Sequence, residues 1–321
     1  MIPARVLAVL LLGVVVAPLV AVAWRGTGLA LGPADWAAVR FTLLQAAVSA
    51  ALATALAVPV ARAIARRGFP GRGFLITLLG APFLLPAVVA VLGLLAVFGR
   101  SGIVNQMLNA LGLPPVSIFG LQGVVIVHVF LNLPLAIRMI LHGWLAVPAA
   151  RLRLAQSLGF GPNEIARHLE RPVLREVLPG VALVIGVLCL TSFAAALMLG
   201  GGPAATTIEL AIYQAIRFDF DLARAAALSL VQVLITGVAA LVVLTVARPS
   251  GLGLGLGQGV RLTGPGGRRL AVDISAIALA VLFLAVPMLA VILAGLPGLD
   301  ALPAQVFAAA GRSVGVALAS A

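Results

Sequence analysis

The polar side chains that could act on a solute are few, and three of them lie inside long apolar segments. His128 and Asn132 share one such segment, and Ser192 lies in another. A polar group at membrane depth is costly, so it usually faces the protein interior or a solute pathway. His128 is therefore expected either to be a satisfied interior histidine or to line a pathway together with Asn132 and Ser192.

A second group of polar residues is acidic and lies between two apolar segments. Glu209, Asp219 and Asp221 are close in sequence. They could attract a cation by their combined negative charge. Alternatively they are helix caps and solvated loop charges, and Asp221 is well placed to cap the helix that follows it. Both interpretations stay open at this point.

The remaining reactive residues show no arrangement that catalysis would need. The three histidines are scattered and have no metal-ligand spacing. The single cysteine, Cys189, cannot form an internal disulfide and is expected to be a small buried packing residue. The chain has no lysine, so the phosphate-binding motif GxxxxGK is excluded. We therefore predict no catalytic residue, no bound cofactor and no metal in this chain.

The composition sets the class of structure that must position these residues. Of the 321 residues, 63% are hydrophobic and 9% are charged, and the mean hydropathy is +1.22. Several apolar runs reach the roughly 20 residues that a helix needs to cross a bilayer. The sequence predicts an all-α bundle in a membrane, with about seven complete spans and a truncated eighth. The expected spans are 6–24, 37–63, 74–98, 121–141, 181–199, 222–246 and 270–296, with the eighth beginning near 305.

The net charge of +12 is distributed in a way that argues for membrane topology and against nucleic acid. If Met1 is cytoplasmic, 15 of the 21 arginines fall on the cytoplasmic side, with four of the nine acidic residues. An excess of arginine on one side is the pattern that fixes the orientation of membrane proteins. We expect a cytoplasmic N-terminus and no nucleic-acid partner.

The longest charged interruption of the apolar sequence is the stretch 150–180. Its pattern predicts two short helices, 151–158 and 163–170, separated by Gly159 and a glycine-proline pair. Leu154 and Leu158 share one face of the first helix at i, i+4 spacing. A short helix in water with a small apolar face is expected to press into a partner. The alternative is an ordinary basic loop.

The spacing of Ala155, Gly159, Leu169 and Pro172 is similar to the cytoplasmic "EAA" loop of ABC-importer permeases. In this sequence Arg153 and Leu154 replace the glutamate and the first alanine of that loop.

Longer segments carry a more specific resemblance. The segment 191–226, TSFAAALMLGGGPAATTIELAIYQAIRFDFDLARAA, resembles the permease subunit of bacterial thiamine and thiamine-pyrophosphate ABC importers. So do VRFTLLQAAVSAALA at 39–53, RRGFPGR at 66–72 and GLQGVVIVHVFLNLPLAIRMIL at 120–141. Members of that family have two homologous halves in one chain. The resemblance therefore implies a first bundle over 1–246, a glycine-rich cytoplasmic linker over 247–269 and the truncated start of a second half over 270–321.

The same resemblance implies a mechanism and a set of partners. A periplasmic binding protein would deliver thiamine, and a separate ATPase dimer would bind beneath the bundle and hydrolyse the ATP. Gly159 would allow the sharp turn of the coupling loop, and Leu169 and Pro172 would anchor it. The implied ATPase-contacting set is Arg153, Leu154, Ala155, Ser157, Leu158, Gly159, Leu169 and Pro172. Thiamine is a cation, so Tyr213 and the outer acids are candidates for an outer gate.

Other functions compatible with the sequence remain. Within the same class, the substrate could be ferric iron or a polyamine. A secondary transporter would work without ATP and would need buried charged pairs in its spans, which the sequence does not offer. A non-transporting scaffold would have no ATPase partner. An integral-membrane enzyme fits least, because no nucleophile, metal cluster or carboxylate pair is present.

Overall fold

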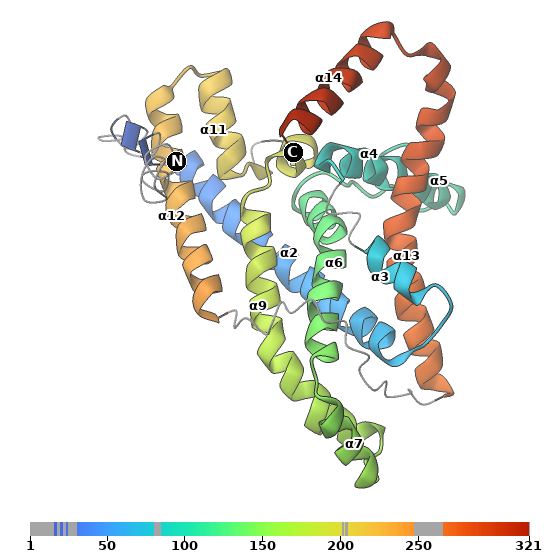
Figure 1. The fold of residues 1–321 in the computed structure, drawn as a ribbon. Helices are drawn as coiled ribbons and strands as arrows, with labels where there is room; N and C mark the ends of the chain where they lie inside the picture. The colour runs from blue at the N-terminus through green and yellow to red at the C-terminus, as the bar shows by residue number, and fades with distance from the viewer. Residues whose placement is uncertain are drawn as a thin grey trace.

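The computed structural model describes residues 31–79, 85–200, 205–246 and 266–320, with Gly202 and a few isolated positions before residue 31. The regular structure within these ranges is entirely helical (Figure 1). In chain order the elements are α2 Pro33–Arg66, α3 Arg72–Leu78, α4 Ala87–Phe98, α5 Ile103–Ala110, α6 Leu121–Leu145, α7 Ala149–Ser157, α8 Pro162–Ile165, η2 Ala166–Glu170, α9 Arg171–Leu190, α10 Phe193–Leu199, α11 Ile208–Arg217, α12 Leu222–Val246, α13 Arg268–Gly295, η4 Leu296–Ala301 and α14 Ala304–Ser320.

Six helical segments of the described chain are long and apolar enough to cross a bilayer. They are Pro33–Arg66, Ala87–Ala110, Leu121–Leu145, Pro162–Leu190, Leu222–Val246 and Arg268–Gly298. The predicted all-α, multi-span fold class is confirmed. The predicted first span lies largely outside the described residues, as does most of the predicted linker. Where we expect an eighth span, α14 is a helix of 17 residues with exposed side chains.

The expected third span, 74–98, carries prolines at positions 82 and 86 that predict an interruption, and it is not a single helix. α3 ends at Leu78 and α4 begins at Ala87, with Pro86 in the capping position before it. Proline has no backbone N–H and fixes its own φ, so it suits the start of a helix better than the interior.

The predicted boundaries around the charged loop are also wrong. The second short helix, 163–170, is the beginning of one continuous helical segment, Pro162–Leu190, and Pro172 lies inside it. A π-helical turn, η2, comes just before Pro172 and shifts the hydrogen-bond register where the proline lacks its donor. At its other end this segment stops at Leu190, and α10 follows as a separate helix, so the predicted fifth span 181–199 is interrupted.

Helix α2 is the centre of the bundle and packs against α6, α9 and α13. Its buried face carries small residues, among them Ala46, Ala50, Ala53 and Ala57. Small side chains let neighbouring helices approach closely, which is how helices associate where lipid removes the hydrophobic driving force. The same cluster includes Ile137 of α6, Ile185 of α9 and Ala280 of α13. α2 therefore holds together helices that are distant in sequence.

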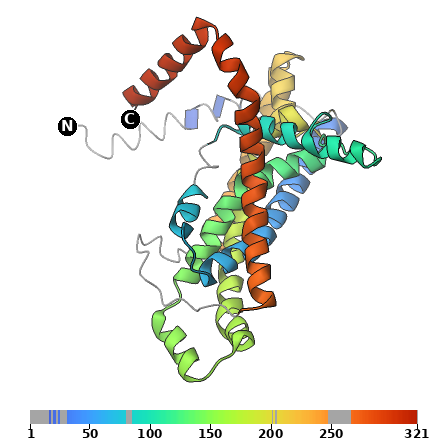
Figure 2. The ribbon, with the colours of Figure 1, turned by 90° about the vertical axis from the view of Figure 1, so that its right-hand side faces the viewer.

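Helix α13 runs along the length of the bundle (Figure 2). The Phe130 and Phe283 rings meet edge to face, with centroids 5.7 Å apart, and join α6 to α13. At Gly93 of α4, an added Cβ would lie 2.6 Å from the carbonyl oxygen of Pro287 in α13. Helix α13, which the sequence assigns to a second half, is therefore packed tightly on α2 and α4.

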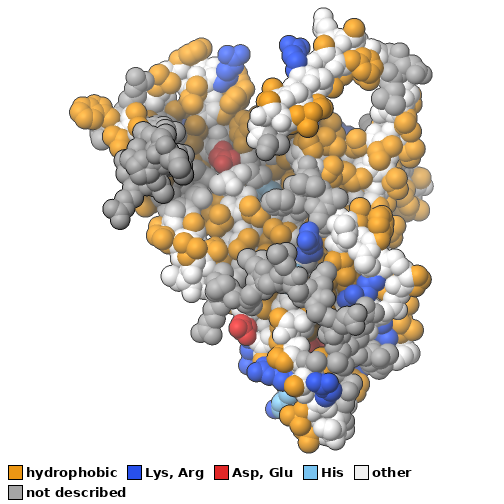
Figure 3. Space-filling view, in the orientation of Figure 1, with side chains coloured by type: hydrophobic (Ala, Val, Ile, Leu, Met, Phe, Trp, Pro, Cys, Tyr) orange, Lys and Arg blue, Asp and Glu red, His pale blue; other side chains and the backbone are white. Residues whose placement is uncertain are grey.

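The distribution of hydrophobic and charged side chains on the surface is typical of a membrane protein. On the face shown in Figure 3, hydrophobic side chains cover the middle of the molecule, and Arg side chains gather mainly toward the end that carries α7. Exposed leucines and valines are numerous along α12 and α13. Such an apolar belt would be unfavourable in water but is expected in contact with lipid.

Candidate coupling surface and transport pathway

Helix α7 and the turn after it project from one end of the bundle (Figure 1). Leu154 is 60% exposed and Leu158 is 61% exposed, whereas Leu152 and Ala155 are buried. The two exposed leucines form an apolar pair at the end of α7. Arg153 and Ser157 are exposed beside this pair, and the Ser157 hydroxyl donates to the carbonyl of Leu154 at 2.9 Å.

A left-handed glycine ends α7. Gly159 has φ +68°, and the backbone N–H of Phe160 donates to the carbonyl of Ala155 at 3.0 Å. This is the bond pattern of a Schellman cap, which needs a residue that tolerates positive φ. The Phe160 ring then meets the imidazole of His168, with centroids 5.7 Å apart, and links the turn to η2. The turn predicted at Gly159 is present.

The other two predicted loop residues lie in the continuous helical segment. Leu169 is half-buried in η2, and Pro172 is exposed in the first turn of α9. Both lie in the first part of the segment Pro162–Leu190, named here the loop arm. The loop arm follows Gly159, whereas α7 precedes it.

Buried ion pairs hold the loop arm to the bundle, and no local pattern in the sequence predicts their partners. Glu170 of η2 accepts from the Nε of Arg66 at 2.8 Å and from Nη2 of Arg62 at 2.9 Å. Nearby, the Nε of Arg67 donates to Asp273 of α13 at 2.7 Å. The arginines at the end of α2, which the charge pattern explains as an orientation signal, therefore also fasten the loop arm and α13 to α2.

His128 and Asn132 lie together in the interior, as their i, i+4 spacing on α6 requires. Ser49 Oγ is 3.3 Å from Nδ1 of His128, and the Asn132 amide donates to the His128 carbonyl at 2.9 Å. The Asn132 nitrogen is also 3.6 Å from Sγ of Cys189, which is buried as predicted. Nε2 of His128 is buried without a partner in the described chain. This group therefore reaches the end of α9, next to the half-buried Ser192.

Two of the three predicted outer acidic residues, Asp219 and Asp221, meet at Arg224, where Asp35 joins them. Asp219 accepts from the Arg224 guanidinium at 2.9 Å, and Asp35 accepts from the same group at 2.8 Å. Asp221 accepts from the backbone N–H of Arg224 at 2.9 Å, which confirms it as the N-cap of α12. Glu209 is half-buried in the first turn of α11, and burial raises the pKa of its carboxyl.

Tyr213 belongs to an aromatic cluster on α11. Its ring lies 5.3 Å from that of Phe193 and 5.9 Å from that of Phe218, between centroids. The Tyr213 side chain is 37% exposed. The cluster ties α10 to α11, and one side of it stays open.

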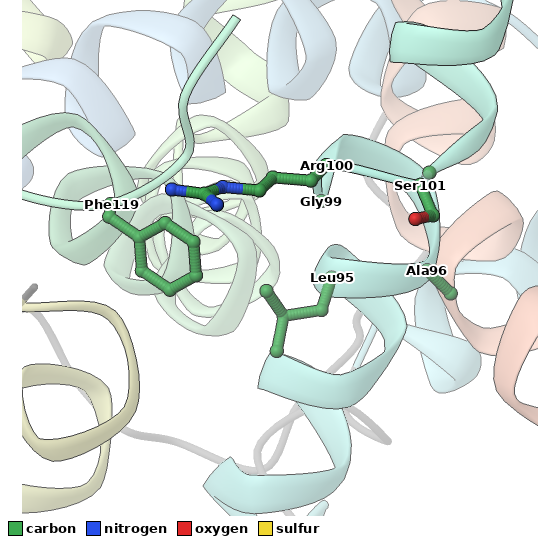
Figure 4. Close-up of a pocket in the computed structure, with 7 residues that line it drawn as sticks. Leu95, Ala96, Gly99, Arg100, Ser101 and Phe119 are labelled. Carbon is green, nitrogen blue, oxygen red and sulfur yellow. The ribbon is translucent and has the colours of Figure 1, made fainter.

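A shallow pocket of about 570 Å³ lies at the corner between α4 and α5. Figure 4 shows the Arg100 side chain extending across it toward the ring of Phe119, with Leu95 below. The lining is mostly apolar and carries a single charged side chain. Among the described residues no group of three or more histidine, cysteine or acidic side chains could hold a metal.

Comparison with known proteins finds relatives of this chain by sequence. The thiamine transport system permease protein ThiP of Brucella abortus is 41% identical over 264 residues, which are 81% of this chain and 49% of that protein. The proteins of the same name from Salmonella typhimurium and Escherichia coli are each 42% identical over 261 residues, with the same coverage. The chain thus spans about half the length of the curated relatives it matches. No protein-family model matches it.

Solved structures share the fold. A bacterial alginate ABC transporter in complex with an alginate-bound periplasmic protein matches with a TM-score of 0.60 at 15% identity, covering 76% of this chain and 93% of the other. A second structure of an alginate-importing ABC transporter matches with a TM-score of 0.59 at 17% identity, covering 77% and 96%. The chain is thus similar in sequence, over 81% of its length, to thiamine transport system permeases, and it shares the helical fold of the two ABC-transporter chains.

Proposed function

We propose that this chain is the membrane-spanning subunit of an ATP-driven importer that takes up thiamine and its phosphates. The observation that carries the proposal is the kinship, over most of the chain, with proteins named thiamine transport system permeases. The absence of any catalytic arrangement in the sequence agrees with a translocation subunit that leaves ATP hydrolysis to a partner. The protein is a multi-pass protein of the bacterial inner membrane in this proposal, with its N-terminus in the cytoplasm.

The ATPase partner would dock on α7. Two leucines about 60% exposed at a helix end are unfavourable in water, and covering them would supply the apolar centre of an interface. The arginines around them support a cytoplasmic position for α7, by the positive-inside pattern. A periplasmic binding protein would then approach the opposite end, where α11 lies (Figure 1).

Coupling requires a rigid connection from α7 to the spans. α7 follows α6, and the arm after Gly159 continues without interruption into α9. Closure of the ATPase dimer on ATP would pull on α7, and the pairs of Glu170 with Arg62 and Arg66 would pass the displacement to α2. The two global states that such transport needs would differ in the tilt of these helices.

Leu158→Arg is the direct test of the docking surface. An arginine placed in the desolvated centre of an interface costs about 2 kcal/mol, so recovery of the ATPase with the full-length permease should fall about thirtyfold. Co-purification from membranes measures this loss. Leu111→Arg is the matched control, because Leu111 is 71% exposed but lies at the end of α5. If Leu158→Arg and the native protein recover the ATPase equally, α7 is not the docking surface.

Gly159→Val tests the turn that presents this surface. A β-branched residue at φ +68° costs about 1–2 kcal/mol, so the cap of α7 should distort while the spans still insert. Thiamine uptake by cells expressing the full-length permease should fall at least fivefold at unchanged membrane abundance. Gly161→Ala is the control, since Gly161 has an ordinary φ of −76° and its nearest neighbour is the end of the Glu164 side chain. Unchanged uptake in Gly159→Val would contradict the coupling role.

The substrate needs its own measurement. Uptake of labelled thiamine, in competition with unlabelled thiamine phosphates, ferric iron or a polyamine, separates the leading substrate from the two alternatives. Competition by iron or polyamine alone would reassign the substrate and leave the permease function standing.

A further inference from the structure

Helix α9 stops at membrane depth without a residue that forces it to stop. The residues from Val187 to Ala195 include neither proline nor glycine. Thr191 and Ser192 nevertheless leave the helical conformation, with φ/ψ of −110°/49° and −122°/81°. Irregular backbone at this depth is tolerated only where protein or a watery cavity satisfies its polar groups. The interruption between α9 and α10, named here the α9 break, is therefore maintained by its surroundings.

Side chains contact each of the last four carbonyls of α9. The Gln45 amide of α2 donates to the carbonyl of Cys189 at 2.9 Å, and the Gln232 amide of α12 donates to that of Leu190 at 2.8 Å. The hydroxyl of Thr191 lies 3.5 Å from the carbonyl of Val187 and 3.4 Å from that of Leu188. These carbonyls are the ones a helix end leaves without intrahelical partners. Three helices thus meet at a helix end that is capped only by neutral side chains.

The groups around the α9 break have acceptors in excess. Oε1 of Gln45 and Oε1 of Gln232 are buried and have no partner in the described chain, and Gln45 is only 1% exposed. The end of a 20-residue helix adds a negative partial charge, which a low dielectric strengthens. The partners of the last four carbonyls include no positively charged side chain, so this field is not neutralised there. A buried amide oxygen without a partner is costly, so a ligand that donates hydrogen bonds would relieve it.

The α9 break also reaches the surface. Thr191 is exposed and Ser192 is half-buried, while the two glutamines lie behind them. A solute at Thr191 would meet hydroxyl groups first and the negative helix end next. No carboxylate takes part in the cluster, so a cation would be attracted without being held tightly, and weak binding is what transit requires.

We infer that the α9 break is the point at which the permease recognises a positively charged organic solute that bears N–H donors. The inference rests on the proposed function, and it assigns the cation selectivity of the membrane step to Gln45, Gln232 and the C-terminal end of α9. Asn132 and His128 support the same region from α6 through the contact of Asn132 with Cys189.

Charge-selective thiol labelling tests this without any transport assay. The full-length permease would carry Thr191→Cys, with Cys189 and any cysteine outside these 321 residues changed to alanine. The cysteine at position 191 is labelled with a cationic and with an anionic methanethiosulfonate reagent. Each labelling rate is divided by the rate at which the same reagent labels a free thiol. The cationic reagent should then be favoured at least fivefold. Ser117→Cys, in the exposed loop before α6, is the control and should give a ratio near one.

The glutamines provide the second arm of the experiment. Gln232→Glu keeps the shape of the side chain and adds a negative charge, so it should raise the cation preference at position 191 at least threefold further. Equal normalised rates at position 191, absence of labelling by both reagents, or a preference that Gln232→Glu leaves unchanged would each overturn the inference. Labelling needs neither ATPase nor binding protein. A permease that shows the cation preference but no thiamine uptake would therefore refute the proposed substrate and leave the α9 break as a cation site.

Discussion

Glu170→Ala is expected to lower the free energy of unfolding of the full-length permease by about 3 kcal/mol, because it leaves Arg66 largely desolvated and unpaired. The side chains of Glu170 and Arg66 are 9% and 10% exposed, so water cannot replace the lost carboxylate. Arg62 is 38% exposed and can turn to solvent. Detergent-solubilised protein titrated with denaturant measures the change. Uptake should fall as well, because the loop arm loses its attachment to α2.

Two further variants separate the ion pair from general effects of charge removal. Glu164→Ala removes an exposed carboxylate from the same helical arm and should change stability by less than about 0.5 kcal/mol. The double variant Arg66→Met with Glu170→Met replaces the pair by apolar groups of similar length and should recover most of the lost stability. Recovered stability without recovered uptake would assign the pair a role in coupling. A harmless Glu170→Ala would show that the arm is held by other contacts.

Gly93→Val is expected to cost about 2–3 kcal/mol, because valine cannot fit between α4 and α13. Its Cβ would lie 2.6 Å from the carbonyl oxygen of Pro287 and 3.1 Å from Cε of Met288. The first of these atoms is backbone, so the whole of α13 must shift. The same denaturant titration of the full-length permease measures the loss.

The control for Gly93→Val is Gly237→Val on α12, where nothing lies within 4 Å of an added Cβ. That variant should change stability by less than about 0.5 kcal/mol, since valine forms helices somewhat better than glycine. Equal stabilities for the two valine variants would mean that α13 does not press on α4 in the membrane.

Features that depend on local composition and spacing can be predicted from the sequence. Runs of apolar residues predict the spans, because a helix in lipid satisfies its own backbone and needs only apolar side chains. The i, i+4 spacing of Leu154 and Leu158, the left-handed turn at Gly159 and the cap at Asp221 are likewise decided within a few residues. These predictions agree with the structure. Where the composition is uniform, as in 181–199, it hides the interruption of a helix.

Tertiary structure alone decided which distant side chains meet. Glu170 pairs with Arg66 across 104 residues, and Gln45 caps the carbonyl of Cys189 across 144 residues. In an apolar bundle many rotations of each helix bury similar area, so hydropathy does not select the face that carries a polar residue. Close packing of small residues and a few polar contacts make that selection. The end of α9 is a helix terminus only because amides from α2 and α12 are present to satisfy it.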